Sequence, residues 1–168
     1  MIISTRERKK YRIIRRYNDQ TEIIMDALDK SILIIEDNPD DGLLTMRALR
    51  KLNYKDIQLV ENGSKALDFL YNRASDKDEE RKLPDLILLD LNLPIIDGFT
   101  ILKKIRSDES TKYIPVIVLT SSGEDKDIKE SYDLGANSYI QKPVDFIEFE
   151  KAALLISEYW LTLNVPPA

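Results

Sequence analysis

The sequence predicts an α/β domain built on a parallel β-sheet, and three observations support this fold class. Short apolar runs, rich in β-branched residues, recur without polar alternation, as in strands that are buried on both faces. Segments with apolar residues at helical spacing separate these runs, so that strand and helix alternate five times. Turn signals that contain glycine stand between the elements. We therefore expect right-handed crossovers that place helices against the sheet.

The strands are expected at the apolar runs, and one helix is expected after each of them. The turn signals Asn62-Gly63 and Asp97-Gly98 precede the second and the third helix. The fifth apolar run is weaker than the other four. The predicted strands cover residues 31–36, 57–60, 85–90, 115–120 and 138–141, and the predicted helices cover residues 43–52, 66–71, 99–105, 128–134 and 145–156.

Length and composition limit the organisation of the chain and its chemistry. The 168 residues fit one domain with extensions. We expect a basic extension at residues 1–30, the domain at residues 31–158 and an apolar tail at residues 159–168. The chain has no cysteine and no histidine, which excludes disulfides, thiolate or histidine metal sites and His-dependent catalysis. A cytoplasmic location fits this composition.

Charge is distributed unevenly along the chain. Residues 1–30 carry eight Lys/Arg against five Asp/Glu, whereas residues 31–168 carry seventeen against twenty-five. The acidic body argues against nucleic-acid binding.

No apolar run approaches the roughly 18–20 residues that span a bilayer, so no membrane partner is expected. The basic extension is either an interaction arm or a solvated segment. Met25 is an alternative position for the natural start of the chain. A charged stretch at residues 72–84 predicts a solvated loop.

Polar residues suited to catalysis or ligand binding stand at the ends of four predicted strands. Glu36 and Asp37 end the first strand, Asp90 ends the third, Thr120 ends the fourth, and Lys142 follows the fifth. Ligands bind beyond the carboxyl ends of the strands in sheets of this type, so these side chains are expected to converge. Taken singly, each has an ordinary explanation, such as a helix cap formed by Asp37 or Asn38, or a surface position for Lys142. Their shared placement favours a site.

The predicted site has the groups that phosphoryl transfer requires. Clustered carboxylates raise each other's pKa unless a cation lies among them, and oxygen ligands of this kind suit Mg²⁺. Mg²⁺ and the Lys142 ammonium would neutralise an incoming phosphoryl group, and the Thr120 hydroxyl would hydrogen-bond its oxygens. A carboxylate such as Asp90 is a competent nucleophile for an acyl phosphate.

Four pieces of the chain form an ordered pattern: Glu36-Asp37, LILLDLNLPIIDG around Asp90, VLTSS around Thr120, and YIQKP with Tyr139 and Lys142-Pro143. With these pieces, residues 31–157 resemble the receiver domains of response regulators. The resemblance implies a flavodoxin-like (CheY-like) fold, a doubly wound five-stranded sheet of order 2-1-3-4-5 with helices on both faces. It also implies a two-component phosphorelay in which a partner histidine kinase supplies the phosphoryl group. Such a protein is a phosphoacceptor, with self-catalysed phosphotransfer and dephosphorylation only, rather than an enzyme.

The resemblance assigns the acidic residues to phosphorylation and metal binding. Asp90 would be the phosphoacceptor. Mg²⁺ would be bound by Asp37, by Asp90 and by the backbone carbonyl of Asn92, with Glu36 acting largely through water. Asn92 and Ser122 occupy positions that tune the dephosphorylation rate in the family.

The resemblance assigns the remaining residues to the conformational switch. Lys142 would contact the phosphoryl group, and its peptide bond to Pro143 would be cis. Thr120 would move toward the phosphoryl group and Tyr139 would follow inward. These movements would change the surface formed by the fourth helix, the fifth strand and the fifth helix.

The loops and the tail resemble a subgroup that includes phytochrome-linked regulators. This resemblance rests on the EDNPDD run, the charged loop and the WLTLNVPP tail, and it suggests a phytochrome-like kinase. The tail would either form a homodimer contact or pack back on the domain. Its apolar residues are Tyr159, Trp160, Leu161, Leu163 and Val165.

Two other functions compete with the receiver interpretation. A haloacid-dehalogenase-like phosphatase also uses an Asp nucleophile, but it usually has a second Asp two residues later, where this chain has Asn92. A receiver-like binding module would work without phosphorylation. The complete set of acidic residues, with Thr120 and Lys142, argues against that module.

Overall fold

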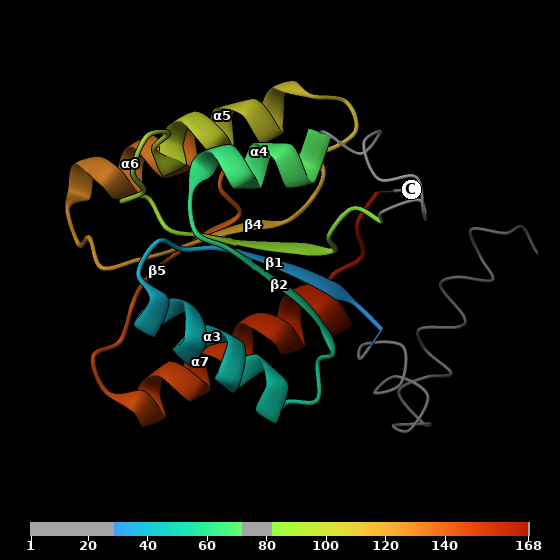
Figure 1. Cartoon of the computed structure of the whole chain (residues 1–168), viewed down its shortest axis with the longest axis vertical. Coiled ribbons are helices and arrows are strands. Elements are labelled where there is room, and N and C mark those ends of the chain that lie inside the picture. The colour runs from blue at the N-terminus through green and yellow to red at the C-terminus, as the bar shows by residue number, and fades with distance from the viewer. Residues whose placement is uncertain (1–28, 72–81, 168) are drawn as a thin grey trace, which may run out of the picture.

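The computed structural model describes residues 29–71 and 82–167, which form a five-stranded parallel sheet with helices on both faces (Figure 1). The strand order β2-β1-β3-β4-β5 confirms the predicted fold class and topology. The strands are β1 (Ser31–Ile35), β2 (Asp56–Val60), β3 (Leu86–Leu89), β4 (Val116–Thr120) and β5 (Ser138–Gln141). The helices are α3 (Pro39–Lys51), α4 (Gly63–Tyr71), α5 (Gly98–Ser107), α6 (Asp125–Asp133), α7 (Phe146–Ser157) and the π-helix η1 (Glu158–Leu163).

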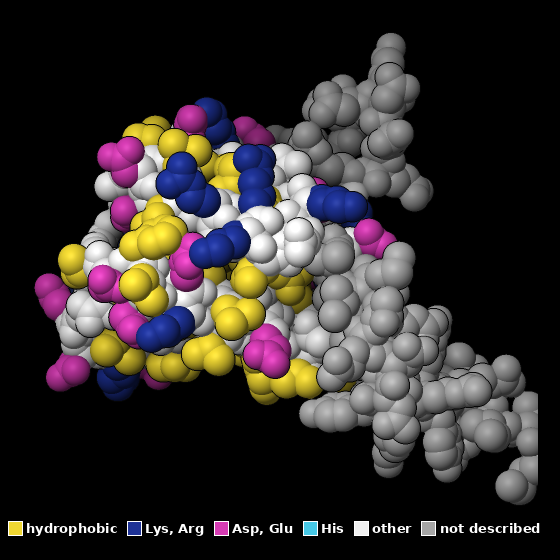
Figure 2. All heavy atoms as spheres, turned by 90° about the horizontal axis from the view of Figure 1, so that it is seen from below, with side chains coloured by type: hydrophobic (Ala, Val, Ile, Leu, Met, Phe, Trp, Pro, Cys, Tyr) yellow, Lys and Arg dark blue, Asp and Glu magenta, His cyan; other side chains and the backbone are white. Residues whose placement is uncertain are grey.

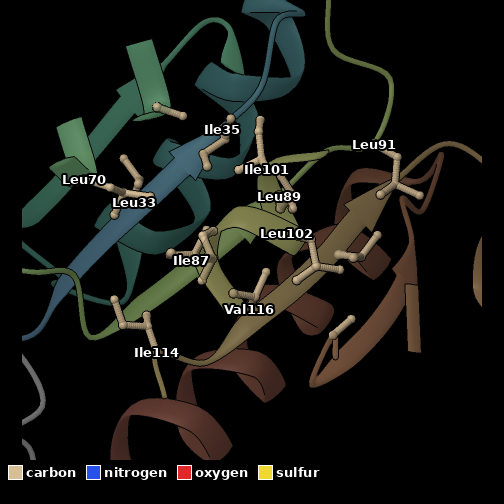
Figure 3. Close-up of a cluster of buried hydrophobic side chains, with 14 of the residues drawn as sticks. Leu33, Ile35, Leu70, Ile87, Leu89, Leu91, Ile101, Leu102, Ile114 and Val116 are labelled. Carbon is tan, nitrogen blue, oxygen red and sulfur yellow. The ribbon is translucent and has the colours of Figure 1, made fainter. Parts of the chain in front are cut away.

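The sheet separates two apolar cores. Every residue of β1, β3 and β4 is buried, as expected for central strands with helices on both faces. On one face, the side chains of Leu33, Ile87 and Val116 pack with α4 and α5 (Figure 3). On the other face, Ile34 and Leu88 belong to a cluster that includes residues of α3 and α7. Figure 1 shows the same division, with α4, α5 and α6 on one side of the sheet and α3 and α7 on the other.

Side-chain caps fix the helices that start beside the carboxyl ends of the strands. Asn38 caps α3 by accepting hydrogen bonds from the backbone N–H groups of Asp40 and Asp41, and Pro39 is the first helical residue. Asp97 caps α5, and Asp145 caps α7. These caps set where each helix begins, and therefore how the residues just before it face the edge of the sheet.

The chain continues from α7 directly into η1, which packs on the domain. Leu161 is buried in the core shared by α3 and α7. Tyr54 is buried in the same core. The start of the expected apolar tail at residue 159 thus lies within this helix, and Leu161 packs back on the domain. The tail residues that remain exposed include Tyr159, Leu163 and Val165.

Two expected features lie largely outside the described residues. The basic extension falls in the undescribed residues 1–28, and most of the loop expected at residues 72–84 falls in residues 72–81. The division of the chain at residues 30 and 158 stays a prediction. No helix in the described part of the chain has the length and apolar character needed to cross a membrane.

Candidate phosphoryl-transfer site

The expected site residues do converge at one edge of the sheet. Glu36 and Asp37 follow β1, Asp90 follows β3, Thr120 ends β4, and Lys142 follows β5. The backbone at this edge is tightly packed, because a Cβ added to Gly98 would lie 2.7 Å from the Cα atom of Leu91 and closer still to the carbonyl oxygen of Asp90. A residue with a side chain at position 98 would displace the strand end that bears Asp90.

Lys142 lies at the centre of the site. Its Nζ atom is 2.6 Å from Glu36 Oε2, 2.8 Å from Asp90 Oδ2 and 2.9 Å from Asp41 Oδ2. The side chains of Lys142, Glu36 and Asp90 are 9%, 3% and 5% exposed, so these three charged groups are almost fully removed from water. Buried charges of this kind persist only when they are paired, and here a single ammonium pairs with three carboxylates.

Burial and Lys142 shift the pKa values of the two buried acids in opposite directions. For Glu36, burial outweighs the attraction of Lys142 and raises the pKa from 4.5 to about 7. For Asp90, burial also acts to raise the pKa, but hydrogen bonds from Lys142, Thr120 and the backbone of Asn92 outweigh it and hold the pKa below its usual value. The carboxylates raise the pKa of Lys142 despite its burial. Asp90 is therefore the more strongly stabilised anion of the pair.

Three carboxylates at this edge are close enough to hold one metal ion. Glu36, Asp37 and Asp90 each offer an oxygen atom, and these oxygens lie within 4.8 Å of one another. Carboxylate oxygens are the ligands that a hard divalent cation prefers. The donor set therefore fits the expected metal, while the role of the Asn92 carbonyl stays a prediction. The Asn92 N–H donates to Asp90 Oδ1 at 3.2 Å.

A chain of hydrogen bonds leads from Asp90 to β5. Thr120 is completely buried, and hydrogen bonding by its side chain helps to lower the pKa of Asp90. The Ser122 N–H donates to Thr120 Oγ1 at 3.4 Å, and the Tyr139 hydroxyl donates to the Ser122 carbonyl oxygen at 3.0 Å. The Ser122 hydroxyl donates to Asp127 Oδ2 at 2.6 Å. The expected switch residues are thus connected to the carboxylate that would be phosphorylated.

The expectation of a cis peptide bond before Pro143 is wrong. No peptide bond in the described residues is cis, so the Lys142–Pro143 bond is trans. The trans form is the lower-energy isomer of an X–Pro bond. In this geometry the Lys142 N–H donates to the Thr120 carbonyl oxygen at 2.7 Å while Nζ reaches all three carboxylates. The cluster therefore forms without a cis bond.

Sequence reasoning missed the part that Asp41 takes in the site. The sequence predicts that Asp41 lies in the first turn of a helix, where a carboxylate complements the helix dipole, and it does lie there in α3. The usable signal was its position near the start of the helix that follows β1, because that helix begins at the same edge as the site. The structure brings its carboxylate to Lys142, 101 positions along the chain.

Comparison with known proteins identifies the family to which this fold belongs. The family model of the response regulator receiver domain matches residues 32–154. The chain belongs to this family. It is homologous to single-domain response regulators of two-component systems, and neither the phosphatase nor the phosphorylation-independent module is favoured. Receiver domains are in general phosphoacceptors rather than classical enzymes, they bind a divalent metal, and histidine kinases phosphorylate them.

Individual receiver proteins are similar over most of this chain. A probable methanogenesis regulatory protein, FilR2, of Methanothrix harundinacea (strain 6Ac) is 39% identical over 81% of the chain and 86% of its own length. The response regulator Rcp1 of Synechocystis sp. (strain PCC 6803) is 35% identical over 83% of the chain and 95% of its own length. The structure of Rcp1 with bound Mn²⁺ matches with a TM-score of 0.71, covering 83% of this chain and 99% of that one. The structure of the phosphorylated cyanobacterial phytochrome response regulator RcpA matches with 38% identity and a TM-score of 0.75, covering 83% and 99% of the two chains.

Proposed function

We propose that Asp90 of this receiver domain accepts a phosphoryl group from a phosphohistidine of a partner kinase. A carboxylate oxygen of Asp90 attacks phosphorus, the phosphorus–nitrogen bond of the phosphohistidine breaks, and an aspartyl phosphate forms. The observation that carries this proposal is the 2.8 Å contact between Lys142 Nζ and Asp90 Oδ2 in a buried site. This contact places a fixed positive charge where negative charge arrives with the phosphoryl group.

Mg²⁺ is the metal that we propose for the site. A divalent ion would supply the remaining charge neutralisation, and Glu36, Asp37 and Asp90 offer the oxygens for it. The finer roles are proposals of the same kind: Asp37 and Asp90 as direct ligands together with the Asn92 carbonyl, and Glu36 largely through water. Support comes from the donor set, because hard carboxylate oxygens from few side chains leave room for the water that Mg²⁺ retains.

The response to phosphorylation would pass through Thr120 and Tyr139. We propose that Thr120 moves toward the phosphoryl group and that Tyr139 follows, which changes the surface around α6, β5 and α7. The hydrogen bonds from Asp90 through Thr120 and Ser122 to Tyr139 support this route. Asn92 and Ser122 would tune the rate at which the aspartyl phosphate is hydrolysed.

We further propose a phytochrome-like histidine kinase as the partner, a cytoplasmic location and a homodimer contact through exposed tail residues. The proposed kinase is supported by the solved relatives RcpA and RtBRR, which are described as phytochrome and bacteriophytochrome response regulators. The proposed dimer is supported by the exposure of Tyr159, Leu163 and Val165, which are 52%, 52% and 62% exposed. No role for nucleic acid or membrane is proposed.

Intact-mass spectrometry after incubation with acetyl phosphate tests the central proposal. We expect one phosphoryl adduct that requires Mg²⁺ and that Asp90→Asn abolishes. Asp97→Asn is a matched control, because Asp97 caps α5 outside the ion cluster. An adduct that persists in Asp90→Asn would refute the assignment of the phosphoacceptor, and continuous release of phosphate from many monoesters would instead indicate a phosphatase.

A further inference from the structure

Asp41 is the third partner of Lys142, and it differs from the other two. The Lys142 ammonium donates hydrogen bonds to Asp41 and Asp90 and forms an ion pair with Glu36, so it has three carboxylate partners. The Asp41 side chain is 37% exposed, whereas those of Glu36 and Asp90 are nearly buried. Asp41 is also outside the group of three carboxylates whose oxygens lie close enough to share a metal ion.

In the proposed function, Glu36 and Asp90 have other tasks. The Asp90 oxygen that bonds to phosphorus loses its negative charge, and with it most of its attraction for Lys142. Glu36 is one of the acids that could hold the metal, and an oxygen that faces a divalent ion is a weaker partner for an ammonium. Asp41 alone keeps a free carboxylate for Lys142 at every stage.

Both ends of the Lys142–Asp41 connection are fixed by secondary structure. The Asp41 N–H donates to Asn38 Oδ1 at 3.3 Å, and the Asp41 carbonyl accepts the Thr45 hydroxyl at 2.9 Å. At the other end, the Lys142 N–H donates to the Thr120 carbonyl oxygen at 2.7 Å. The lysine side chain therefore extends from β5 across the site to the first turn of α3. A side chain with four rotatable bonds gains orientation from such attachment at both ends.

We propose that Asp41 is a positioning residue that holds the Lys142 ammonium beside Asp90 while Glu36 and Asp90 change partners, an inference that rests on the proposed phosphoryl transfer. Asp41 touches neither the phosphoryl group nor the metal, and it acts only through the lysine. A simple charge effect would have the opposite sign, because a carboxylate near the site repels an incoming phosphoryl group. The two effects can therefore be separated by experiment.

Three variants separate positioning from charge. Asp41→Ala removes both the charge and the acceptor, Asp41→Asn removes the charge but keeps an oxygen acceptor for Nζ, and Asp40→Ala removes a neighbouring acid of the same helical turn. At saturating Mg²⁺ we expect Asp41→Ala to lower the maximal rate of phosphorylation by acetyl phosphate about fivefold, the size of one partly exposed ion pair. Asp41→Asn should recover much of this loss, and Asp40→Ala should match the wild type. An Asp41→Ala protein as fast as the wild type, or faster, would overturn the proposal.

A second measurement does not depend on phosphorylation. The ¹H–¹⁵N signal of the Lys142 ammonium reports whether the group is held or exchanges freely with water. With Mg²⁺ added, we expect the signal to persist in the wild type and in Asp40→Ala, and to be lost in Asp41→Ala. An equally protected signal in Asp41→Ala would overturn the proposal. If the wild type takes up no phosphoryl group, the proposed function fails, whereas the ammonium signal still tests the contact itself.

Discussion

Tyr139 and Ser122 join β5 to the loop after β4, through the hydrogen bond from the Tyr139 hydroxyl to the Ser122 carbonyl oxygen at 3.0 Å. The Tyr139 ring is half-buried and packs against the apolar core on the α4 and α5 side of the sheet. Burial raises the pKa of the Tyr139 hydroxyl, so it remains a hydrogen-bond donor at neutral pH. Any movement of Thr120 that draws the Ser122 backbone with it must strain or break this bond. The position of the Tyr139 side chain is therefore coupled to that of Thr120, and through Thr120 to the carboxylate cluster.

The first prediction concerns this bond. Tyr139→Phe removes only the hydroxyl, so the loop at residues 121–124 should open more often while the rest of the domain stays unchanged. We expect a loss of about 0.5–1.5 kcal/mol in the free energy of unfolding, the usual net value of one hydrogen bond. Urea denaturation measures the loss, and amide hydrogen exchange locates it. Tyr132→Phe is the control, because Tyr132 lies on the exposed side of α6. Unchanged exchange at residues 121–124 would contradict the coupling.

The second prediction concerns Lys142→Met. This change leaves Glu36 and Asp90 buried without their cation, so the metal-free protein should lose up to about 3–5 kcal/mol of stability. Added Mg²⁺ should restore part of the loss, because an ion that binds only the folded state stabilises it. Urea denaturation with and without Mg²⁺ checks both effects. Lys151→Met removes an exposed pair with Glu148 and should change stability little. A Lys142→Met protein as stable as the wild type without Mg²⁺ would refute this account.

The fold was predictable because the strands and helices have clear periodicities. The central strands of the sheet, such as β1 and β4, have helices on both faces, so they appear in the sequence as unbroken apolar runs. The candidate site residues were found for the same reason, since the end of each such run marks the edge of the sheet. The involvement of Asp41 was not predictable, because a helical carboxylate has several common roles and its contact with Lys142 depends on how α3 lies against the sheet.

Arg106 illustrates a second limit of the sequence. It donates hydrogen bonds to the carbonyl oxygens of Gly135, Lys112 and Ile114 and to Asn137 Oδ1. These bonds tie the end of α5 to the segments that lead into β4 and β5. In the sequence Arg106 is one cation on an amphipathic helix, and nothing local distinguishes it from its solvated neighbours. Such long-range bonds to backbone carbonyls become visible only when the fold is known.

The third prediction concerns pH. Burial raises the pKa of Glu36 in the folded protein from its ordinary value of 4.5 to about 7. Between these two pH values the folded state holds its proton more tightly than the unfolded state, so the metal-free protein should become less stable as the pH rises from about 5 to 7.5. Metal binding requires the ionised acid, so Mg²⁺ affinity should rise over the same range and level off above it. Mg²⁺ titrations and urea denaturation at several pH values measure both trends. The chain has no histidine to titrate in this interval.

The Glu36→Gln variant is the control for this pH dependence. It keeps the shape of the side chain and its acceptor oxygen but cannot ionise. Both the loss of metal-free stability and the rise in Mg²⁺ affinity should become much smaller in this variant. If the wild type and Glu36→Gln show the same pH dependence, another group is responsible for it.

The fourth prediction concerns Ile95, in the loop between β3 and α5. Ile95 has a φ of 71° and its side chain is 87% exposed. A β-branched residue is strained in the left-handed region, at a cost of about 1–2 kcal/mol, and an exposed side chain gains little burial in return. Ile95→Gly relieves this strain but gives the unfolded chain more freedom, which offsets about 0.5–1 kcal/mol. We expect a net gain of roughly 0.5–1 kcal/mol in the free energy of unfolding. Ile95→Ala removes the branched side chain but retains a Cβ, so it should gain much less. Thermal or urea denaturation of the two variants and the wild type measures these differences in stability. An Ile95→Gly protein no more stable than Ile95→Ala would show that the backbone conformation at this position carries no strain.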